Sequence, residues 1–394
     1  DRQTDRHADK NTKIFYEKSM RIWKVFLVII LIIAGLFLSL RLTTVQDLIF
    51  KTLVNNLANF ESSFPAEDSL SAIVCGSRSP LVSPGRAQTC IAVQAGSNIF
   101  IVDIGDGSAN NIQAFNIPTD KIKAVLITHL HSDHISDLAD LHLLSWVQGR
   151  NSKLKVFGPE GIDLVTSGFE LAYEKDYQFR TEHHGDEMLP KAIAGFDTTT
   201  IDLNNAVIFD KNGLKITAFK VTHEPIDPAL GFRFDYKGRS IVISGDTSYD
   251  ENLAKAAKDA DVMFAEAQAN HMLNVMKESV DGPLEKILDD IQTYHMTPVE
   301  AARLAKMARV DHVIFYHLNP APRIGIMEDI FTRGVDEIIE DWTMSKDGTM
   351  VVLPIESNEI KQKSRQIIQL VSDFAKKIEQ RKLINFFLPL SSFL

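Results

Sequence analysis

The stretch VLITHLHSDHISDL, residues 125–138, decides the fold, because in it an apolar run ends in a cluster of side chains that bind metals. Four such side chains stand within six positions: His129, His131, Asp133 and His134. Alternating positions at a strand end point to the same side, so these groups can meet at one edge of a sheet. Imidazole and carboxylate groups together suit zinc, and two adjacent ions can divide the set. The less favoured alternative is a polar surface loop rich in histidine.

The same arrangement, an apolar strand that ends in a ligand-type residue, occurs three more times. These residues are His223 in ITAFKVTH, Asp246 in SIVISGD and His317 in HVIFYH. Sheets bring strand ends together, and two metal ions about 3.5–4 Å apart need several ligands and a shared carboxylate. We therefore predict a single site built from five histidines and two aspartates.

Short β-rich runs bounded by Gly and Pro alternate with helical patterns along most of the chain. The predicted strands are residues 71–77, 89–96, 98–105, 123–129, 154–159, 213–223, 230–236, 239–247, 261–267, 312–318 and 349–355. The predicted helices are 137–148, 251–260 and 297–309, and in the last of these Thr297 and Glu300 form a capping box around Pro298. Strands in a meander followed by strands that alternate with helices predict an α/β fold, an αββα sandwich of two mixed sheets with outer helices.

An apolar segment, residues 22–42, precedes this fold and is uncharged from Val25 to Leu40. About 20 such residues span a bilayer, so we predict one transmembrane helix. A cleaved signal peptide is the alternative, but the run is longer than usual and no small-residue cleavage site follows it. Seven basic residues precede or enter the segment, which places the N-terminus in the cytoplasm and the catalytic domain outside, in the periplasm or the extracellular space.

These patterns divide the chain into five parts. We expect a cytoplasmic segment (1–21), the anchor (22–42), a linker (43–69), the catalytic domain (70–356) and an amphipathic C-terminal tail (357–394). For the tail, a helix docked on the domain is favoured over membrane contact or dimerisation. Loops within 159–205 are expected to carry substrate determinants. His183 and His184 fall in a polar stretch there and are interpreted as solvated, with a lid over the site as the alternative.

Charge and cysteine content restrict partners and compartment. The formal net charge is −10, from 52 acidic and 42 basic residues, so no domain-wide positive field favours nucleic acid. We therefore expect a small-molecule ester substrate in preference to nucleic acid. The sequence does not decide between a monomer and a homodimer. Cys75 and Cys90 are too few for a disulfide scaffold and lack C-x-x-C spacing, so we expect free thiols unless the domain lies in an oxidising compartment. No G-x-S-x-G elbow and no phosphate loop with its lysine is present.

Over roughly residues 70–355 the sequence resembles the metallo-β-lactamase-fold hydrolases, whose H-x-H-x-D-H motif matches residues 129–134. The resemblance implies a dinuclear centre with two zinc ions, or with manganese or iron at one of the two positions. It further implies that Asp246 bridges the two ions. One ion would be held by His129, His131 and His223, and the other by Asp133, His134 and His317.

Within that superfamily the chain looks most like the ribonuclease Z and arylsulfatase-like branch. The motifs are DIGDG (103–107), FGPEG (157–161), SGDT (244–247) and YHMTPVEAARLAKMARVDHVIFYHLNP (294–320). His295 in the last motif matches the position of the branch's proton-donating histidine. Two departures stand out. Only 22 residues separate His223 from Asp246, which leaves no room for a long tRNA-gripping extension, and Ala265 stands where the branch often carries a histidine.

The mechanism implied by this inventory is metal-assisted hydrolysis. A metal-bridging hydroxide is available near neutral pH and attacks the ester, and His295 acts as general acid, with Asp133 as the second catalytic residue. Glu266 is a candidate to orient His295, and Asp103 either orients a ligand or is only a turn residue. We expect a membrane-anchored dinuclear zinc hydrolase of a phosphodiester or related ester. The alternatives are an arylsulfatase-like or lactone hydrolase with the same site, or a non-catalytic binding protein.

Overall fold

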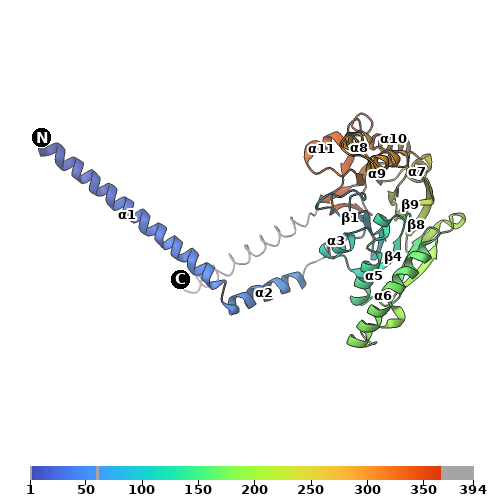
Figure 1. Ribbon diagram of the computed structural model, residues 1–394, viewed down its shortest axis with the longest axis horizontal. Coiled ribbons are helices and arrows are strands. Elements are labelled where there is room, and N and C mark those ends of the chain that lie inside the picture. The colour runs from blue at the N-terminus through green and yellow to red at the C-terminus, as the bar shows by residue number, and fades with distance from the viewer. Residues whose placement is uncertain (1, 59–61, 365–394) are drawn as a thin grey trace. The chain divides into compact units, whose positions relative to one another are not determined.

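A computed structural model describes residues 2–58 and 62–364, and the chain divides after Glu61 into two compact units. The N-terminal unit contains helices α1 (Arg2–Ser39) and α2 (Thr43–Ala58) (Figure 1). Within α1, Ser19–Ser39 has a mean hydropathy of 2.6 and no buried residue in its apolar window. By length and composition this segment is able to cross a membrane, although a signal sequence would meet the same criterion. Residues 43–58 of the expected linker (43–69) form helix α2.

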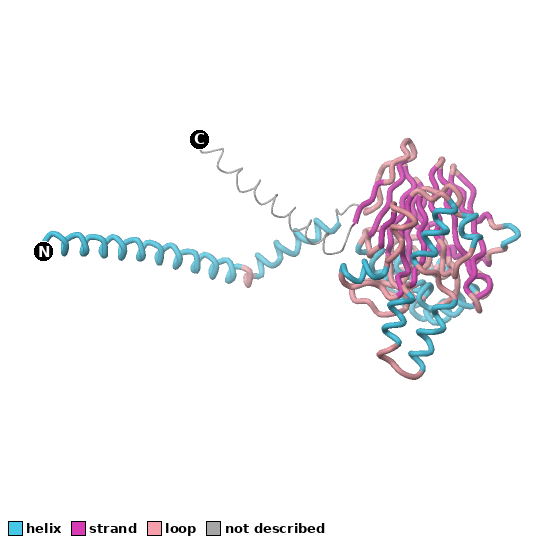
Figure 2. The backbone as a smooth tube through the Cα atoms, turned by 90° about the horizontal axis from the view of Figure 1, so that it is seen from above, coloured by secondary structure: helices cyan, strands magenta, loops and turns pink. Residues whose placement is uncertain are grey.

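The second unit is a sandwich of two mixed sheets (Figure 2), as predicted. In the first sheet β3 to β6 are parallel and the other neighbours antiparallel; in the second β10 to β13 are parallel and β7 to β10 antiparallel. The first sheet has the order β15 (Lys361–Ser364), β14 (Thr349–Pro354), β1 (Ser69–Gly76), β2 (Cys90–Ala95), β3 (Asn98–Val102), β4 (Ile122–Leu126), β5 (Leu154–Gly158), β6 (Phe196–Thr200). The second has the order β13 (Trp342–Met344), β12 (His312–Asn319), β11 (Val262–Gln268), β10 (Arg239–Ile243), β9 (Ile226–Tyr236), β8 (Leu214–His223), β7 (Val207–Lys211).

Helices cover the outer faces of both sheets. The helices of this unit are α3 (Ser108–Ala114), α4 (Ser132–Ile135), α5 (Leu138–Val147), α6 (Ile162–His184), α7 (Glu251–Ala256), α8 (Asn270–Lys277), α9 (Pro283–Asp290), α10 (Pro298–Ala308) and α11 (Gly325–Phe331). The outer core of the first sheet includes residues of α3, α5 and α6, and that of the second includes residues of α7 and α10. Strand β1 shows how the sequence serves both layers: Leu70, Ala72 and Val74 pack between the sheets, whereas Ile73 and Cys75 pack toward the helices. Strands that are buried on both faces consist of continuous apolar runs, so they can be predicted from the sequence.

The expectation of free cysteines is wrong, because Cys75 and Cys90 form a disulfide. They lie on the antiparallel neighbours β1 and β2, where an irregularity in the pairing sets Gly76 opposite Cys90. This register brings the two Cα atoms to 5.0 Å, which is within bridging range. Both residues are fully buried.

The segment 159–205 is also more regular than expected. Helix α6 occupies its first half, and His183 and His184 form the last turn of that helix, exposed to solvent, rather than part of a loop. Of the expected C-terminal tail, residues 361–364 form strand β15, which pairs with β14. The rest of that tail, 365–394, lies outside the described residues.

The capping box predicted for the helix after His295 is present in α10. The Thr297 hydroxyl accepts from the Glu300 amide at 3.3 Å, and a Glu300 carboxylate oxygen accepts from the Thr297 amide at 2.8 Å. The two interactions fix the first turn of the helix. Because His295 precedes this cap by two residues, the cap also limits where the His295 backbone can lie.

Candidate metal centre

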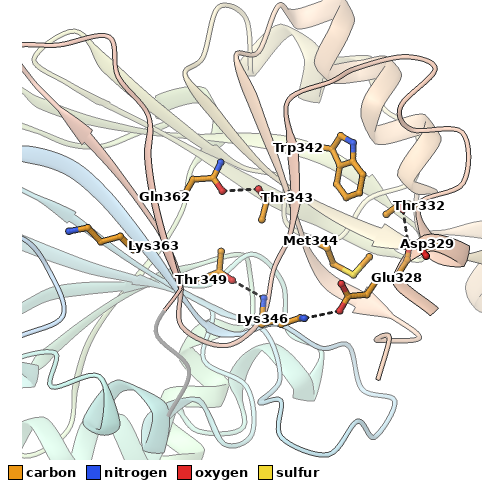
Figure 3. A pocket seen from close by; sticks show the side chains of 10 residues that line it. All are labelled: Glu328, Asp329, Thr332, Trp342, Thr343, Met344, Lys346, Thr349, Gln362 and Lys363. Carbon is orange, nitrogen blue, oxygen red and sulfur yellow. Dashed lines mark hydrogen bonds and ion pairs between the residues drawn. The ribbon is translucent and has the colours of Figure 1, made fainter. Parts of the chain in front are cut away.

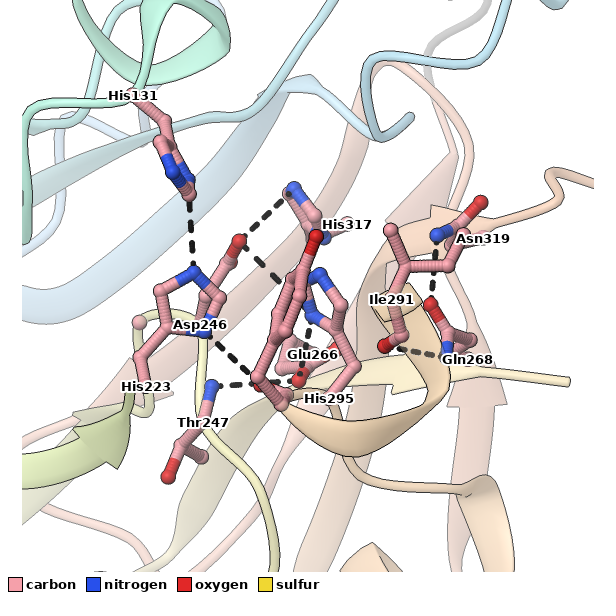
Figure 4. Close-up of polar contacts among 12 residues, drawn as sticks. His131, His223, Asp246, Thr247, Glu266, Gln268, Ile291, His295, His317 and Asn319 are labelled. Atoms are coloured by element: carbon pink, nitrogen blue, oxygen red, sulfur yellow. Dashed lines mark hydrogen bonds and ion pairs between the residues drawn. The ribbon is translucent and has the colours of Figure 1, made fainter. Parts of the chain in front are cut away.

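All the ligand-type residues singled out in the sequence converge at one end of the sandwich. Figure 4 shows His131, His223, Asp246 and His317 of this set. Each stands at or just beyond the end of a buried strand, or in the short helix α4, so the strand ends of both sheets supply the site. Six of the seven are buried and His131 is partly exposed. The seven are His129, His131, Asp133, His134, His223, Asp246 and His317.

Three imidazoles form the first group. His129 Nε2 lies 2.9 Å from His131 Nδ1, and His223 Nε2 lies 3.4 Å from the same atom. Ring nitrogens this close to one another point to a common centre, where a cation would accept all three lone pairs. This group is the set that the sequence resemblance assigns to one ion.

The second group joins Asp133, His134 and His317. Asp133 Oδ2 lies 3.1 Å from His317 Nε2 and 3.5 Å from His134 Nε2. Asp246 stands between the groups. Its Oδ2 is 3.3 Å from the Nε2 atoms of both His134 and His317, and 3.9 Å from His129 Nε2. A carboxylate in this position is suited to contact two ions at once.

Buried polar atoms test whether a metal fits these residues. His134 Nε2 and Asp246 Oδ1 are buried and make no hydrogen bond among the described residues. A buried polar atom without a partner costs free energy, and a cation at the centre would remove that cost for both atoms. Burial also lowers the pKa of His129 well below its ordinary value and that of His223 to about 4, so both imidazoles are neutral at pH 7. The donor set therefore fits a divalent metal.

A shell of hydrogen bonds orients the ligands. Asp103, which is 1% exposed, accepts from His134 Nδ1 at 2.9 Å and from the Thr128 amide at 2.8 Å. His223 Nδ1 donates to the Tyr294 carbonyl at 2.9 Å. In both cases Nδ1 is the donor, which directs Nε2 and its lone pair to the centre. Of the two interpretations of Asp103, the structure supports the orienting residue.

Backbone conformation at this end of the sandwich is unusual at Asp103, His317 and Gly245, and His317 has a φ of +47°. Asp103 has a φ of +56°, in the left-handed region that non-glycine residues rarely occupy. Gly245, next to Asp246, has a φ of +64°, and a Cβ atom there would lie 2.2 Å from the Leu230 carbonyl oxygen. Only glycine permits this approach, so Gly245 is required to place Asp246 at the centre.

His295 lies beside the centre but outside both groups. Its ring stacks on that of His317 with centroids 5.6 Å apart, and its Nδ1 is 3.1 Å from Glu266 Oε1 and 4.0 Å from Asp246 Oδ2. Glu266 is fully buried, and the same carboxylate oxygen accepts from the Met296 amide at 3.1 Å. The expected contact between Glu266 and His295 is therefore present, and Figure 4 shows it.

Sequence reasoning missed Tyr294. Its ring centroid lies 5.1 Å from that of His223 and 5.0 Å from that of His295, so it forms part of the wall of the site. The signal that was available is an aromatic residue directly before His295. By contrast, no contact of the described residues joins His183 or His184 to the centre, and the two rings pack against each other.

A separate cavity of about 470 Å³ lies between α11 and the strands β13, β14 and β15 (Figure 3). Its charges are mixed, and Lys346 already pairs with Glu328 at 2.8 Å. Thr343 donates to Gln362 at 2.9 Å across the same cavity. The lining contains no histidine, so this cavity does not share the chemistry of the metal centre.

Comparisons with known proteins agree with this geometry. A family model described as "Beta-lactamase superfamily domain" matches residues 105–318. Ribonuclease Z of Mycobacterium marinum is 31% identical over 249 residues, which cover 62% of this chain and 85% of that protein. Ribonuclease Z of Mycobacterium bovis is 32% identical over 255 residues, covering 64% and 87%. The metallo-beta-lactamase fold protein YhfI of Bacillus subtilis superimposes with a TM-score of 0.53 at 19% identity, covering 73% of this chain and 100% of that one, a likeness of fold.

These relatives correct one expectation from the sequence. The preference for a small-molecule ester over nucleic acid is wrong, because the similar proteins are ribonucleases. That expectation rested on the net charge of −10, which is a property of the whole chain. Net charge does not report how cations are distributed over the surface, and binding of a polyanion depends on the local distribution.

Proposed function

Because this chain belongs to the beta-lactamase superfamily, and within it to the ribonuclease Z branch of metal-dependent hydrolases, we propose that it hydrolyses phosphodiester bonds in RNA at a centre of two zinc ions. One observation carries the proposal. Two groups of metal-ligand side chains lie side by side at the end of the sandwich, and Asp246 contacts both. The ribonuclease Z relatives supply the substrate class.

In this proposal His129, His131 and His223 hold one ion, and Asp133, His134 and His317 hold the other. Asp246, which lies between the two groups, would be a ligand that both share. Imidazole nitrogen and carboxylate oxygen are borderline donors, which zinc accepts, although manganese or iron would also suit the group that contains Asp133.

When bound, the ions would lower the pKa of a water molecule and polarise the phosphate. Side chains of the protein would supply the proton for the leaving group and orient the water. Glu266 engages His295 at Nδ1, which leaves Nε2 free to protonate the leaving oxygen of the ester. Asp133 is proposed as the second catalytic residue, because its carboxylate stands at the centre and is able to orient the attacking water. Tyr294 closes one side of the site next to His295.

We further propose that Ser19–Ser39 anchors the chain in a membrane, with residues 70–356 as a catalytic domain outside the cytoplasm. Two features support this arrangement. Basic residues gather before the apolar segment, as expected for a cytoplasmic flank. In addition, a Cys75–Cys90 disulfide is typical of proteins in oxidising compartments. The RNA substrate would then be extracytoplasmic.

The test combines metal content with RNA cleavage. We expect about two zinc ions per chain in elemental analysis and metal-dependent cleavage of RNA. His131→Ala should lose metal and activity together, whereas His183→Ala, an exposed histidine on α6, should keep both. A metal-supplemented preparation that binds no metal would refute the centre. A fully loaded preparation that cleaves small phosphodiesters but no RNA would refute the substrate.

A further inference from the structure

A second cavity, of about 680 Å³, lies on the helix-covered face of the β8–β9 hairpin, where α7 packs on β8 (Figure 1). We call it the β8–α7 groove. Four cationic side chains line it against a single carboxylate, although the chain as a whole is acidic. The charged lining residues are Lys215, Lys220, Arg233, Lys255 and Asp235.

Part of the groove wall is an aromatic ring lying across a glycine. A Cβ atom at Gly231 would lie 2.4 Å from the ring of Phe219 and 2.8 Å from the Ser244 carbonyl oxygen. Glycine at this position therefore lets the Phe219 ring lie close against strand β9. Phe219 also packs on the outer core of the second sheet, which fixes the ring, and it stays partly exposed.

Two of the four cations have structural roles. Arg233 donates to the carbonyls of Ala256 at 2.7 Å and Lys258 at 2.9 Å, and so holds the C-terminal end of α7. It also pairs with Asp235 at 2.9 Å. Lys220 pairs with Asp227 at 2.6 Å. These side chains shape the groove and are already partnered.

The other two cations form no ion pair among the described residues, although Lys215 lies opposite Asp210 on β7 and Asp235 on β9 in the sheet. The ammonium group of Lys255 donates to the neutral Asn252 amide oxygen at 3.3 Å and likewise has no described carboxylate partner. Both side chains are exposed. Each therefore has charge available for an anion from solution.

The β8–α7 groove is connected to the metal centre through strand β8, which ends at His223. The Thr222 hydroxyl donates to Asp250 at 2.8 Å, and this contact joins the end of the strand to the start of α7. At about 3.3 Å per residue, Lys220 lies about 10 Å and Lys215 about 26 Å along the strand from His223. Several nucleotides of an extended strand would cover that distance.

We propose that the β8–α7 groove binds the backbone phosphates of single-stranded RNA that extends from the metal centre. Lys215 and Lys255 contact phosphates, and the exposed part of Phe219 offers an apolar surface to a base. Cations combined with an aromatic surface in one groove are typical of sequence-tolerant binding to single strands. The proposal rests on the RNA phosphodiesterase function proposed above, and it explains how an acidic chain holds a polyanion.

The test uses the full chain with charge reversal, Lys215→Glu together with Lys255→Glu. The matched control is Lys121→Glu with Lys123→Glu, an equal charge change at exposed residues where β4 begins. Binding of a short labelled single-stranded RNA is measured by fluorescence anisotropy over a salt series, and turnover is measured on the same RNA and on bis(p-nitrophenyl) phosphate. We expect Kd for RNA to rise at least 10-fold in the groove variant, and its dependence on log salt to fall by roughly 1.4, the value for two phosphates on a single strand. Turnover of bis(p-nitrophenyl) phosphate should stay as in the wild type.

The outcomes separate the two proposals. Groove and control variants that bind RNA equally well would overturn the groove, even if RNA cleavage is intact. Groove-dependent RNA binding by a chain that cleaves no RNA would support the groove and refute the proposed reaction. A milder pair, Lys215→Gln with Lys255→Gln, should give the same salt effect without introducing negative charge. A groove variant that loses binding to anionic lipid vesicles but keeps RNA binding would also overturn the groove proposal.

Discussion

His295 differs from the neighbouring histidines in what its ring nitrogens do. The Nδ1 atoms of His134 and His223 are held by an oxygen acceptor while Nε2 faces the centre. His295 Nδ1 is likewise held, by the buried Glu266, and this residue is not one of the seven proposed ligands, although it also lies close enough to His223 and Asp246 to share a metal with them. A histidine fixed at one nitrogen beside a metal centre is suited to proton transfer at the other.

This arrangement predicts a leaving-group effect. His295→Ala should retain both metals, while turnover of esters with strongly basic leaving groups falls by roughly 10²- to 10⁴-fold, the usual scale for general acid catalysis. Nitrophenolate is a good leaving group and needs little protonation, so nitrophenyl esters should lose much less. Rates of wild type and variant across a series of leaving-group pKa values, with zinc measured in each sample, decide the matter. Equal losses across the series would instead assign His295 to substrate orientation.

The clustering of the proposed ligand residues was predictable from the sequence because each stands at or near the end of a strand with a strong apolar signal. His223, Asp246 and His317 are examples, and the fold places them together because sheets align their strand ends. Tyr294 was not predictable in this way. Its contacts with His223 and His295 depend on how the segment before α10 turns back over the second sheet, and no local pattern encodes that path.

A second histidine, His142 of α5, has a structural role. Burial and the nearby Arg150 lower its pKa to about 3, and its Nε2 accepts from the Gly195 amide at 2.6 Å. In the unfolded chain its pKa is near 6.5, so the unfolded state binds the extra proton first. Protonation of His142 in the unfolded chain should therefore lower the free energy of unfolding progressively as the pH falls from about 6.5 toward 3.

Urea unfolding at pH 7 and at pH 5, with metal removed from every sample, tests this expectation. The loss of stability between the two pH values should be smaller in His142→Gln than in the wild type, because the variant cannot take up the proton. His184→Gln, on the exposed end of α6, is the control and should behave as wild type. If His142→Gln loses as much stability as the control, the buried histidine has no part in acid sensitivity.

Among the elements, the strands that the sequence predicts are those inside each sheet, and the strands that it misses are the four at the edges. The missed strands are β6, β7, β13 and β15. Residues of β6 and β7 are mostly exposed or partly exposed, so these strands carry no continuous apolar run. Edge strands are often short and polar, which protects against pairing with other chains. Their absence from the prediction therefore follows from the physics of a sheet edge.

Helix α6 was missed for a related reason. It spans Ile162–His184, yet its buried residues are few: Ile162, Thr166 and Tyr177. A helix that covers the sheet with a narrow stripe lacks the broad apolar periodicity by which amphipathic helices are recognised. The helix α10, with a capping box and a wide buried face, was predicted correctly.

The disulfide between β1 and β2 gives a prediction at the scale of these elements. It closes a chain segment with a sequence separation of 15, for which loop-closure entropy gives a stabilisation of about 3 kcal/mol. Cys75→Ala with Cys90→Ala should lower the free energy of unfolding by about that amount. Reduced wild type should match the double variant in urea unfolding, because both lack the link. Two reactive thiols in unreduced, denatured wild type would show that the bond does not form.

At the scale of the whole molecule, average properties and local ones point in different directions. The net charge of −10 indicated a substrate other than nucleic acid, whereas the β8–α7 groove gathers four cations against one carboxylate. Acidic residues elsewhere, for instance on α9, contribute to the average without affecting the groove. Composition is therefore a poor guide to a polyanion substrate, and the arrangement of charge over the fold has to be known.

The last prediction concerns the orientation of the chain in a membrane. If Ser19–Ser39 spans the bilayer with the basic flank inside, a membrane-impermeant maleimide should label Ser167→Cys, on the exposed face of α6, in intact cells. Gln3→Cys should be labelled only after permeabilisation. The native cysteines give no background, because Cys75 and Cys90 are buried and linked to each other. The reverse labelling pattern would place the catalytic domain in the cytoplasm, where a stable disulfide is not expected. A soluble chain that begins near residues 39–44 would identify the apolar segment as a cleaved signal sequence, and the RNA substrate would then be met in solution rather than at the membrane.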